Sequence, residues 1–444
     1  MKEFYDLVII GGGPAGYRAA EKAKKHFKTA LFESKNPGGV CLNEGCVPTK
    51  TLLHIVKDIA AAKTLGGYGF TLSGAPDLNK ISRQKDRVIK ILRAGVRESI
   101  NGVDYFNEKA VIEGVSDGKF VVAGENVTVL ADKLLIATGS SAAVPPVAGL
   151  REALDAGAAV TNAGALEITA IPQRFVIIGG GVIGVEMAAI YSALGSSVTI
   201  VEATDKLLPQ MDTELGKYIG KAFAGNGIRI YTSAKAERIL PSEDGNRLII
   251  DTAEGQKEII FDKLLVATGR RPNTAGIGLE NIGVKIERGI VTDEYMRTSV
   301  PKVWASGDVN GKMMLAHKAY READAAVSDM LGQPVKVRYD SIPEAVYTLP
   351  EVASVGAKEG DVPGAEVRKI PASFSARYVA ESASRDGFIK TVSLKGRLIG
   401  IQLAVPYATE IASSAAMMIE LGMTADEVGK LCFPHPSVSE LLLI

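Results

Sequence analysis

Two cysteines separated by four residues are the side chains of this chain best suited to redox chemistry. Cys41 and Cys46 lie in a glycine-containing segment from Gly38 to Lys50, and the whole chain of 444 residues holds only three cysteines. On a regular helix a five-residue step turns by roughly 140°, which would point the two thiols apart. A disulfide needs Cα atoms within about 7 Å, so we expect the backbone to leave the helical conformation between them. We therefore expect a pair that cycles between disulfide and dithiol.

The residues around the pair support that layout. Gly45 allows the departure from helix, and Pro48 is well placed to open the helix that follows. Cys46 would then lie near a helix N-terminus, where the helix dipole favours a thiolate. The third cysteine, Cys432, has no obvious partner, and we expect it to be a buried apolar filler.

The elements that must position the cysteines follow a pattern that occurs twice, about 170 residues apart. In each copy an apolar strand runs into a glycine-rich turn and a helix, and a second strand then ends on a glutamate. The first copy has strands at 7–10 and 29–32 around a helix at 17–25; the second has strands at 175–178 and 197–201 around a helix that ends at Leu194. Each copy is typical of a β-α-β unit that binds a dinucleotide.

The glycines of each turn have separate tasks. They are Gly11, Gly13 and Gly16 in the first copy, and Gly179, Gly181 and Gly184 in the second. The first of each set makes the tight turn, the second lets the backbone approach a pyrophosphate, and the third allows close helix–strand packing.

The glutamates that end the second strands, Glu33 and Glu202, follow the last motif glycine by 17 and 18 residues. Each would accept hydrogen bonds from ribose hydroxyls, or would be an ordinary loop carboxylate. A carboxylate at Glu202 would repel a 2′-phosphate, and the next residues, 203–205, supply no arginine to receive one. The second site should therefore prefer NAD to NADP.

Further segments mark where domains meet. Two strands end on Ala-Thr-Gly, at Ala137-Thr138-Gly139 and at Ala267-Thr268-Gly269, and are natural places for the chain to cross between domains. Asp308 follows a strand and a glycine turn, so its carboxylate could hold a polyol hydroxyl or be a plain turn aspartate. From about Val335 onward, short strands precede a helix-like stretch at 408–421, which indicates an α+β module without a nucleotide fingerprint.

A few charged side chains could assist the cysteines. His435 lies between two prolines that restrict the backbone, and Ser437 and Glu440 after it fit a capping box that opens a short helix. His435 could carry protons while Glu440 orients its ring, or it could be a satisfied surface histidine beside a capping glutamate. Lys50 and Glu186 could lie near a reacting ring between two nucleotide domains, or could be solvated helix charges.

Composition excludes several classes of protein. Lysine plus arginine (51) balances aspartate plus glutamate (51), which argues against a nucleic-acid or membrane-surface protein. No apolar stretch reaches membrane-spanning length, and we expect no metal site. The chain enters an expected strand at 6–10 directly, without room for a signal peptide, and its few cysteines favour a reducing compartment. We therefore expect a cytoplasmic protein.

Together these motifs make the chain similar to the flavoprotein disulfide reductases of the pyridine nucleotide type. The resemblance spans nearly the whole chain and also includes Ala267–Asn273, Ser306–Asp308 and Tyr347–Ala353. It implies an α/β fold with two Rossmann-like dinucleotide-binding domains and a C-terminal α+β dimerisation domain. It implies an FAD-binding domain at 1–148 and 269–335, an NAD-binding domain at 149–268, and an interface domain at 336–444.

The resemblance also implies roles for individual residues. FAD would bind the first glycine loop together with Glu33, Lys50, Ala137, Thr138, Gly139, Asp308, Ala316 and His317; NAD would bind the second loop with Glu202 and Gly269. Cys41 would be the interchange thiol, and Cys46 the thiol that faces the flavin. Lys50 would pair with Glu186 beside the flavin. His435, oriented by Glu440, would shuttle the proton from the partner subunit of a homodimer.

Within this family the chain most resembles the enzymes that oxidise dihydrolipoamide. The implied reaction passes electrons from a lipoyl arm through the Cys41–Cys46 disulfide and FAD to NAD+, in a 2-oxoacid dehydrogenase complex or a glycine cleavage system. The absence of arginines after Glu202 disfavours glutathione and trypanothione reductases, and the absence of a second cysteine pair disfavours mercuric and large thioredoxin reductases. Another disulfide reductase, a diaphorase and a non-catalytic scaffold subunit are the alternatives.

Overall fold

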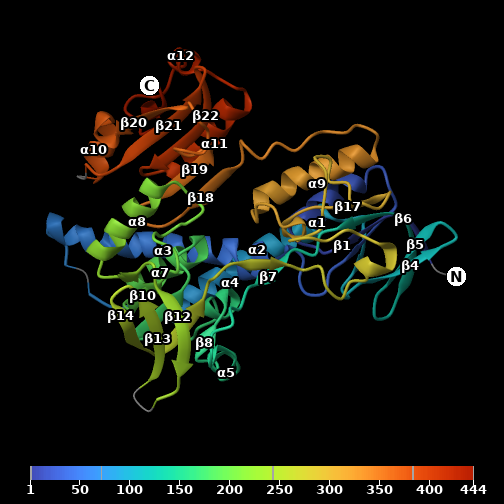
Figure 1. The fold of residues 1–444 in the computed structure, drawn as a ribbon, viewed down its shortest axis with the longest axis horizontal. Helices are drawn as coiled ribbons and strands as arrows, with labels where there is room; N and C mark the ends of the chain where they lie inside the picture. Colours follow the sequence, from blue (N-terminus) through green and yellow to red (C-terminus); the bar gives the residue numbers. More distant parts are fainter. Residues whose placement is uncertain (1–2, 72, 243–244, 383–384, 444) are drawn as a thin grey trace. The chain divides into compact units, whose positions relative to one another are not determined.

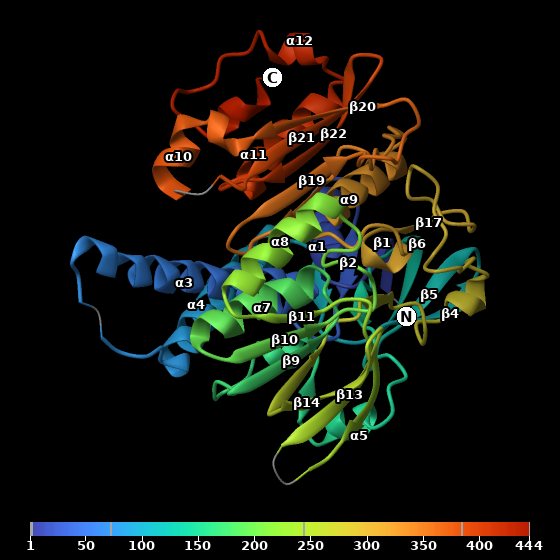
Figure 2. The same cartoon turned by 60° about the vertical axis from the view of Figure 1, so that its left-hand side comes forward.

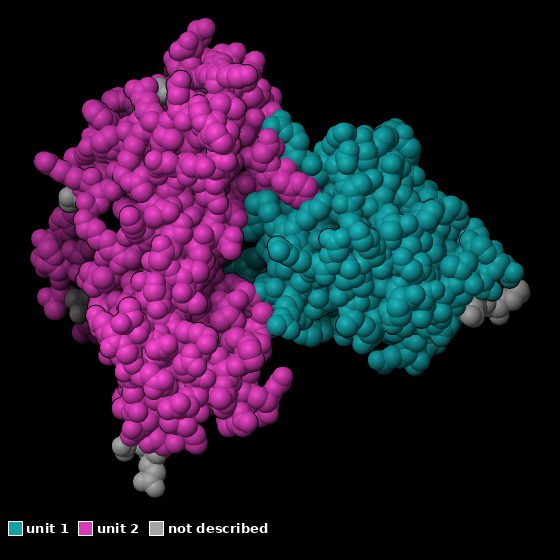
Figure 3. All heavy atoms as spheres, viewed as in Figure 1, with its two compact units in different colours: residues 1–51, 82–142, 270–338 teal, residues 52–81, 143–269, 339–444 magenta. Residues whose placement is uncertain are grey.

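The computed structural model describes residues 3–71, 73–242, 245–382 and 385–443, and the chain divides into two compact units (Figure 3). The first unit comprises residues 1–51, 82–142 and 270–338, and the second comprises residues 52–81, 143–269 and 339–444. The domain boundaries expected from the sequence, after residues 148, 268 and 335, stay predictions.

A mixed sheet with strand order β3-β2-β1-β6-β5-β4 forms the first unit, and β17 pairs with β6 (Figure 1). The strands are β1 (Glu3–Ile10), β2 (Thr29–Phe32), β3 (Asp104–Phe106), β4 (Val111–Ser116), β5 (Lys119–Ala123), β6 (Thr128–Ile136) and β17 (Val303–Ala305). Strands β1, β2, β3, β6 and β17 run parallel, whereas β4 and β5 form an antiparallel hairpin on β6. The apolar run Leu7–Ile10 is almost entirely buried, as in a parallel strand that is covered on both faces.

Helices and short strands complete the first unit. Helix α1 (Pro14–Ala23) packs on α9 (Ala316–Met330). The remaining elements are α2 (Gly39–Glu44), β7 (Ser140–Ala142), β16 (Arg270–Pro272), which pairs with β7, and the 3₁₀ turns η2 (Leu279–Ile282) and η3 (Asp308–Asn310). Helices α3 (Cys46–Thr64) and α4 (Leu78–Ser99) each contain a boundary between the units, and η1 (Leu65–Tyr68) follows α3.

The second unit contains the other β-α-β copy. Its parallel sheet has the order β11-β10-β9-β15-β8, and an antiparallel sheet has the order β12-β13-β14. The elements are α5 (Leu150–Asp155), β8 (Ala159–Val160), α6 (Asn162–Ala165), β9 (Arg174–Ile178), α7 (Val182–Leu194), β10 (Ser197–Val201), α8 (Thr213–Gly225), β11 (Arg229–Tyr231), β12 (Lys235–Leu240), β13 (Asn246–Thr252), β14 (Gly255–Phe261) and β15 (Lys263–Val266).

The C-terminal part of the second unit is an antiparallel sheet of order β18-β19-β22-β21-β20, against which α11 packs (Figure 2). Its elements are β18 (Pro343–Val346), β19 (Val352–Gly356), β20 (Glu366–Pro371), η4 (Ala372–Phe374), α10 (Ala376–Ser382), β21 (Phe388–Leu394), β22 (Arg397–Ala404), α11 (Ala408–Glu420), α12 (Ala425–Val428) and η5 (Ser439–Leu442). Its apolar core lies between α11 and the strands. The predicted fold class, with its C-terminal α+β module, is confirmed.

Two local predictions differ from the structure. The helix expected at 17–25 begins earlier, at Pro14, because a proline at the first helical position costs no hydrogen bond. Cys432, expected to be buried, is exposed in the chain, because it lies in an irregular, mostly exposed segment that follows α12. Across the described ranges, no helix is both long and apolar enough to cross a membrane.

Candidate active site

The cysteines lie where one helix stops and the next begins. Helix α2 ends at Glu44, Gly45 leaves the helical region with φ −146° and ψ −110°, and Cys46 is the first residue of α3. The break in the helix and the N-terminal position of Cys46 are as predicted. Cys46 is exposed and Cys41 is half-buried.

The two thiols are close enough to influence one another. A hydrogen bond to Cys46, burial, and repulsion by Cys46 hold the pKa of Cys41 well above its ordinary value, while the nearby charge of Lys50 acts in the opposite direction. The same interactions disfavour the thiolate form of Cys41. Cys46, at the start of α3, lies where the helix dipole favours a thiolate.

A brace that sequence reasoning missed holds α2. Arg93 of α4 donates from Nε and Nη2 to Asn43 Oδ1, at 3.0 and 2.7 Å. Asn43 in turn donates to the carbonyl oxygen of Gly39 at 2.8 Å. Asn43 lies between the two cysteines, so the brace fixes the backbone that carries them. No sequence pattern links residues 50 positions apart in this way.

The first glycine loop fits a close approach of nucleotide. Gly11 has φ +106°, and a Cβ there would lie 2.3 Å from the Ala137 carbonyl oxygen. A Cβ at Gly16 would lie 1.7 Å from the Gly11 oxygen, so only glycine lets α1 pack this tightly. The backbone nitrogen of Gly12 donates to Glu33 Oε2 at 2.7 Å. This bond fixes the carboxylate at the mouth of the loop.

The second loop repeats this geometry. Gly179 has φ +111°, and its Cβ would lie 2.3 Å from the Ala267 oxygen, while a Cβ at Gly184 would lie 2.0 Å from the Gly179 oxygen. Gly180 donates to Glu202 Oε2 at 2.6 Å. A Cβ on Gly181 would meet no described protein atom within 4 Å. The space beside Gly181 is what a bound pyrophosphate would need, so the residues present fit a dinucleotide.

Asp308 belongs to a polar cluster within the first unit. Ser140 Oγ donates to Asp308 Oδ2 at 2.5 Å, and Arg270 Nε donates to Ser140 Oγ at 2.7 Å. Thr138 is held nearby, because its hydroxyl donates to the Asn273 oxygen at 2.7 Å and its carbonyl accepts from Asn273 Nδ2 at 2.9 Å. The Ala-Thr-Gly turn and the Arg-Arg-Pro-Asn segment therefore support each other. Sequence reasoning did not identify Ser140 as a partner of Asp308.

A buried ion pair braces the turn that carries Asp308. Lys318 and Glu322 of α9 are fully buried and 3.0 Å apart. Glu322 accepts from the Gly307 nitrogen at 2.7 Å, and Lys318 donates to the Gly307 oxygen at 3.1 Å. The same helix begins at Ala316, which places Ala316 and His317 in its first turn, where amide groups favour an anion.

The expected partners Lys50 and Glu186 lie in different units. Lys50 is half-buried in α3, and Glu186 is buried in α7 with 3% of its surface exposed. Glu186 Oε1 accepts from the Tyr347 backbone nitrogen at 3.1 Å. The Lys50–Glu186 pairing stays a prediction.

The expected histidine–glutamate contact forms. His435 Nδ1 lies 2.7 Å from Glu440 Oε1, and the Ser437 nitrogen donates to Glu440 Oε2 at 2.6 Å. These two bonds lower the pKa of Glu440. The predicted capping box is only half right, because the Ser437 hydroxyl contacts Ser439 and the element is the 3₁₀ turn η5.

Comparisons with known proteins agree with this geometry. Residues 5–323 match the model of the pyridine nucleotide-disulphide oxidoreductases, and residues 342–443 match the dimerisation domain of that family. A dihydrolipoyl dehydrogenase of Thermus scotoductus is 37% identical over 99% of this chain and 96% of that protein, and dihydrolipoyl dehydrogenase 3 of Pseudomonas putida is 35% identical over 99% and 96%.

Solved structures give the same result. LpdA from Mycobacterium tuberculosis has a TM-score of 0.87 at 25% identity and covers 99% of this chain and 98% of its own. The Cu(II) complex of RclA, an HOCl-induced flavoprotein disulfide reductase from Escherichia coli, has a TM-score of 0.85 at 26% identity, with 98% of each chain covered. The chain belongs to the pyridine nucleotide-disulphide oxidoreductase family.

Proposed function

We propose that this protein is a dihydrolipoyl dehydrogenase, which oxidises dihydrolipoamide to lipoamide and reduces NAD+. The interacting thiols of Cys41 and Cys46 at the start of α3 carry the proposal, because they are the dithiol that such a reaction regenerates in each turnover. Identity of 34–37% with curated dihydrolipoyl dehydrogenases over nearly the whole chain supports the substrate class.

The cysteines and His435 have separate roles in the thiol chemistry. His435 takes a proton from one thiol of dihydrolipoamide, and the resulting thiolate attacks Cys41 of the Cys41–Cys46 disulfide, releasing Cys46 as a thiolate. The second substrate sulfur then displaces Cys41, which leaves lipoamide and the reduced pair. Two electrons and two protons pass from substrate to protein in this half-reaction. Glu440 orients the histidine ring through the Nδ1 contact.

Both nucleotide sites have residues that fit their proposed ligands. FAD would be held by the Gly11–Gly16 loop, Glu33, Ala137–Gly139, Lys50, Asp308 and the first turn of α9. When bound, it supplies two-electron chemistry between the dithiol and the nicotinamide. NAD would be held by the Gly179–Gly184 loop, Glu202 and Gly269. The buried carboxylate of Glu202 supports NAD over NADP, since it would repel a 2′-phosphate.

Assembly follows from the dimerisation domain. We propose a homodimer in which His435 and Glu440 serve the cysteines of the partner subunit, and in which Lys50 and Glu186 pair beside the flavin. The partners would be the lipoyl domains of a 2-oxoacid dehydrogenase complex or the lipoyl-bearing protein of a glycine cleavage system. The FAD-binding (1–148 and 269–335), NAD-binding (149–268) and interface (336–444) divisions belong to this proposal, and a cytoplasmic location stays a prediction.

An anaerobic titration tests the function. Dihydrolipoamide is added to the purified flavoprotein while the absorption spectrum is recorded, and NAD+ is then added. We expect a long-wavelength charge-transfer band that disappears as NADH forms, and no NADPH when NADP+ is substituted. A bound flavin that dihydrolipoamide fails to reduce would exclude this substrate. Reduction by NADH with turnover of another disulfide would then identify a different reductase of the family.

A further inference from the structure

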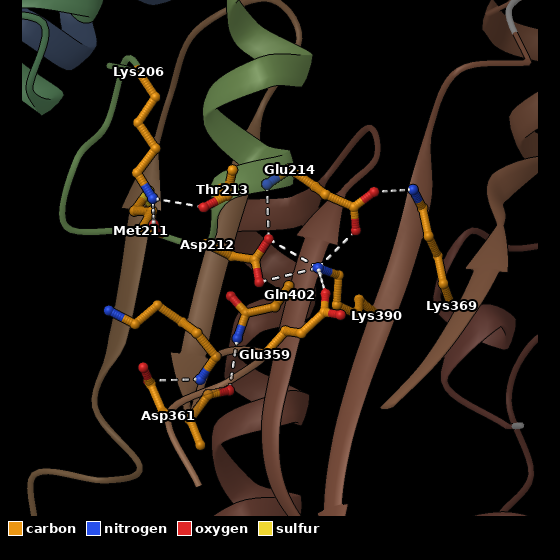
Figure 4. A network of polar contacts seen from close by, with 12 residues as sticks. Lys206, Met211, Asp212, Thr213, Glu214, Glu359, Asp361, Lys369, Lys390 and Gln402 are labelled. Atoms are coloured by element: carbon orange, nitrogen blue, oxygen red, sulfur yellow. Dashed lines mark hydrogen bonds and ion pairs between the residues drawn. The ribbon is translucent and has the colours of Figure 1, made fainter. Parts of the chain in front are cut away.

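A buried lysine joins the nucleotide-binding part of the second unit to its C-terminal sheet. Lys390 of β21 has a side chain only 1% exposed, and its Nζ lies 3.0 and 3.1 Å from the two carboxylate oxygens of Asp212 (Figure 4). Glu214 Oε2 lies 2.6 Å and Glu359 Oε2 2.8 Å from the same nitrogen. Asp212 and Glu214 come from the start of α8, whereas Glu359 follows β19.

The charges of this cluster hold it together. Burial opposes the charge of Lys390, but the hydrogen bonds that it donates to Glu214, Glu359 and Asp212 raise its pKa above the ordinary value. Glu214 is shared with Lys369 of β20, which contacts its other oxygen. Asp212 is also buried, at 3% exposed. Breaking a buried pair of this kind leaves an uncompensated charge, so the cluster is a firm anchor.

Asp212 ends the segment that leaves the second nucleotide site. Residues 203–212 run from Glu202 to the cap of α8, where Asp212 accepts from the Glu214 nitrogen. Near its start, Thr204 donates from its nitrogen and hydroxyl to Glu202 Oε1, at 2.7 and 2.8 Å. The segment therefore supports the Glu202 carboxylate, which is proposed to bind the ribose.

The same segment touches the second glycine loop. The Leu208 nitrogen donates to the Gly180 oxygen at 2.8 Å, and the Leu207 side chain is so close that a Cβ on Gly180 would meet it at 2.6 Å. Lys358 of the C-terminal part also contacts the segment, because its Nζ donates to the Gln210 carbonyl oxygen at 3.0 Å. The segment thus contacts the glycine loop through Leu207 and Leu208, and Lys358 and Lys390 link it to the C-terminal part.

We propose that Lys390 and Asp212 are positioning residues for NAD: their ion pair anchors segment 203–212, which in turn holds Glu202 and the Gly180 backbone in place for the adenosine half. This inference rests on the proposed NAD site and adds a determinant of nucleotide affinity within the C-terminal sheet. Neither residue touches the nicotinamide or the cysteines in this role.

The test compares two links to the segment with a matched control. Lys390→Met removes the buried anchor, and Lys358→Met removes the outer one without burying an unpaired charge. Lys221→Met is the control, because Lys221 also joins α8 to the C-terminal part, through Asp386 at 2.8 Å, but far along the helix from Asp212. Exposed ion pairs such as this contribute little.

Direct binding of NADH to the flavin-loaded protein is measured first, without lipoamide. We expect Lys390→Met to raise the Kd for NADH about tenfold or more, Lys358→Met to raise it by a smaller factor, and Lys221→Met to leave it unchanged. The FAD content and the KM for dihydrolipoamide should stay at wild-type values. Reduced nicotinamide mononucleotide, which lacks the adenosine half, should bind all variants equally.

Several results would overturn the inference. An unchanged Kd for NADH in both Lys390→Met and Lys358→Met would exclude a role in nucleotide binding. If the binding of NADH and that of the mononucleotide are weakened equally, or if bound FAD is lost together with NADH binding, the two lysines have a general structural role. If Lys390→Met does not fold, the Lys358→Met result decides. Because NADH binding needs no lipoyl substrate, failure of the proposed substrate leaves this test intact.

Discussion

Cys41 and Cys46 differ in surroundings although they are partners. The contact with Cys46 and burial hold the pKa of Cys41 above its ordinary value, whereas Cys46 is exposed at the start of α3. Replacing Cys46 by serine leaves no disulfide for the substrate to attack. We expect turnover of dihydrolipoamide with NAD+ to fall by at least about a thousandfold in Cys46→Ser. A diaphorase would instead keep its rate of NADH oxidation by artificial acceptors, and retained turnover of dihydrolipoamide would exclude the redox role of the pair.

Substitution of Glu440 tests whether this carboxylate assists His435. Its hydrogen bonds to His435 and to the Ser437 nitrogen lower its pKa. The carboxylate is therefore ionised, and the contact is complete, at any pH above the ordinary pKa of a glutamate. The contact is lost only as the pH falls through the lowered pKa of Glu440. We expect Glu440→Gln to reduce kcat by about ten- to a hundredfold, and His435→Gln by about a hundredfold or more. The ratio of wild-type to Glu440→Gln rates should shrink toward one at acid pH, where the wild-type carboxylate becomes protonated and the contact is lost. A ratio that stays the same down to acid pH would contradict this role.

At the scale of elements, one glycine of each loop allows the helix to pack closely, and another leaves space for a ligand. A Cβ on Gly184 would overlap the Gly179 oxygen at 2.0 Å, whereas a Cβ on Gly181 would meet no described protein atom within 4 Å. We therefore expect Gly181→Ala to keep the melting temperature and FAD content of the wild type but to raise the KM for NAD+ at least about tenfold. Gly184→Ala should also lower the melting temperature. Thermal unfolding and nucleotide titration of both variants check this, and a wild-type KM in Gly181→Ala would argue against nucleotide at this loop.

Short-range patterns made much of the fold predictable. Each β-α-β copy is set by apolar strands, glycine turns and the terminal glutamate, all within about 30 residues, and both copies form as expected. The half-formed capping box at Ser437 shows the limit, because the direction of one hydroxyl decides it. The Lys318–Glu322 pair has ordinary helical spacing, and nothing local reveals that tertiary packing buries it completely. The Arg93–Asn43 and Lys390–Asp212 contacts likewise depend on how distant segments meet.

At the scale of the whole molecule, the C-terminal sheet would have two roles. Residues 342–443, which contain it, match a dimerisation domain. It would form the subunit contact, and it presents His435 and Glu440 on an exposed segment after α12. Within its own subunit the same sheet supplies Lys390, which anchors the segment beside the second glycine loop. One sheet would thus support nucleotide binding in its own subunit and proton transfer in the partner.

The proposed sharing of the site between subunits predicts complementation. In a heterodimer of Cys46→Ser and His435→Gln, isolated with two different tags, one site combines an intact cysteine pair with an intact histidine. We expect about half of the wild-type activity, because one of two symmetry-related sites is complete. The matched control pairs a wild-type subunit with a subunit that carries both substitutions. It should be almost inactive, since each site then lacks either Cys46 or His435. The opposite outcome, an inactive first heterodimer and a half-active control, would place the whole site within one subunit.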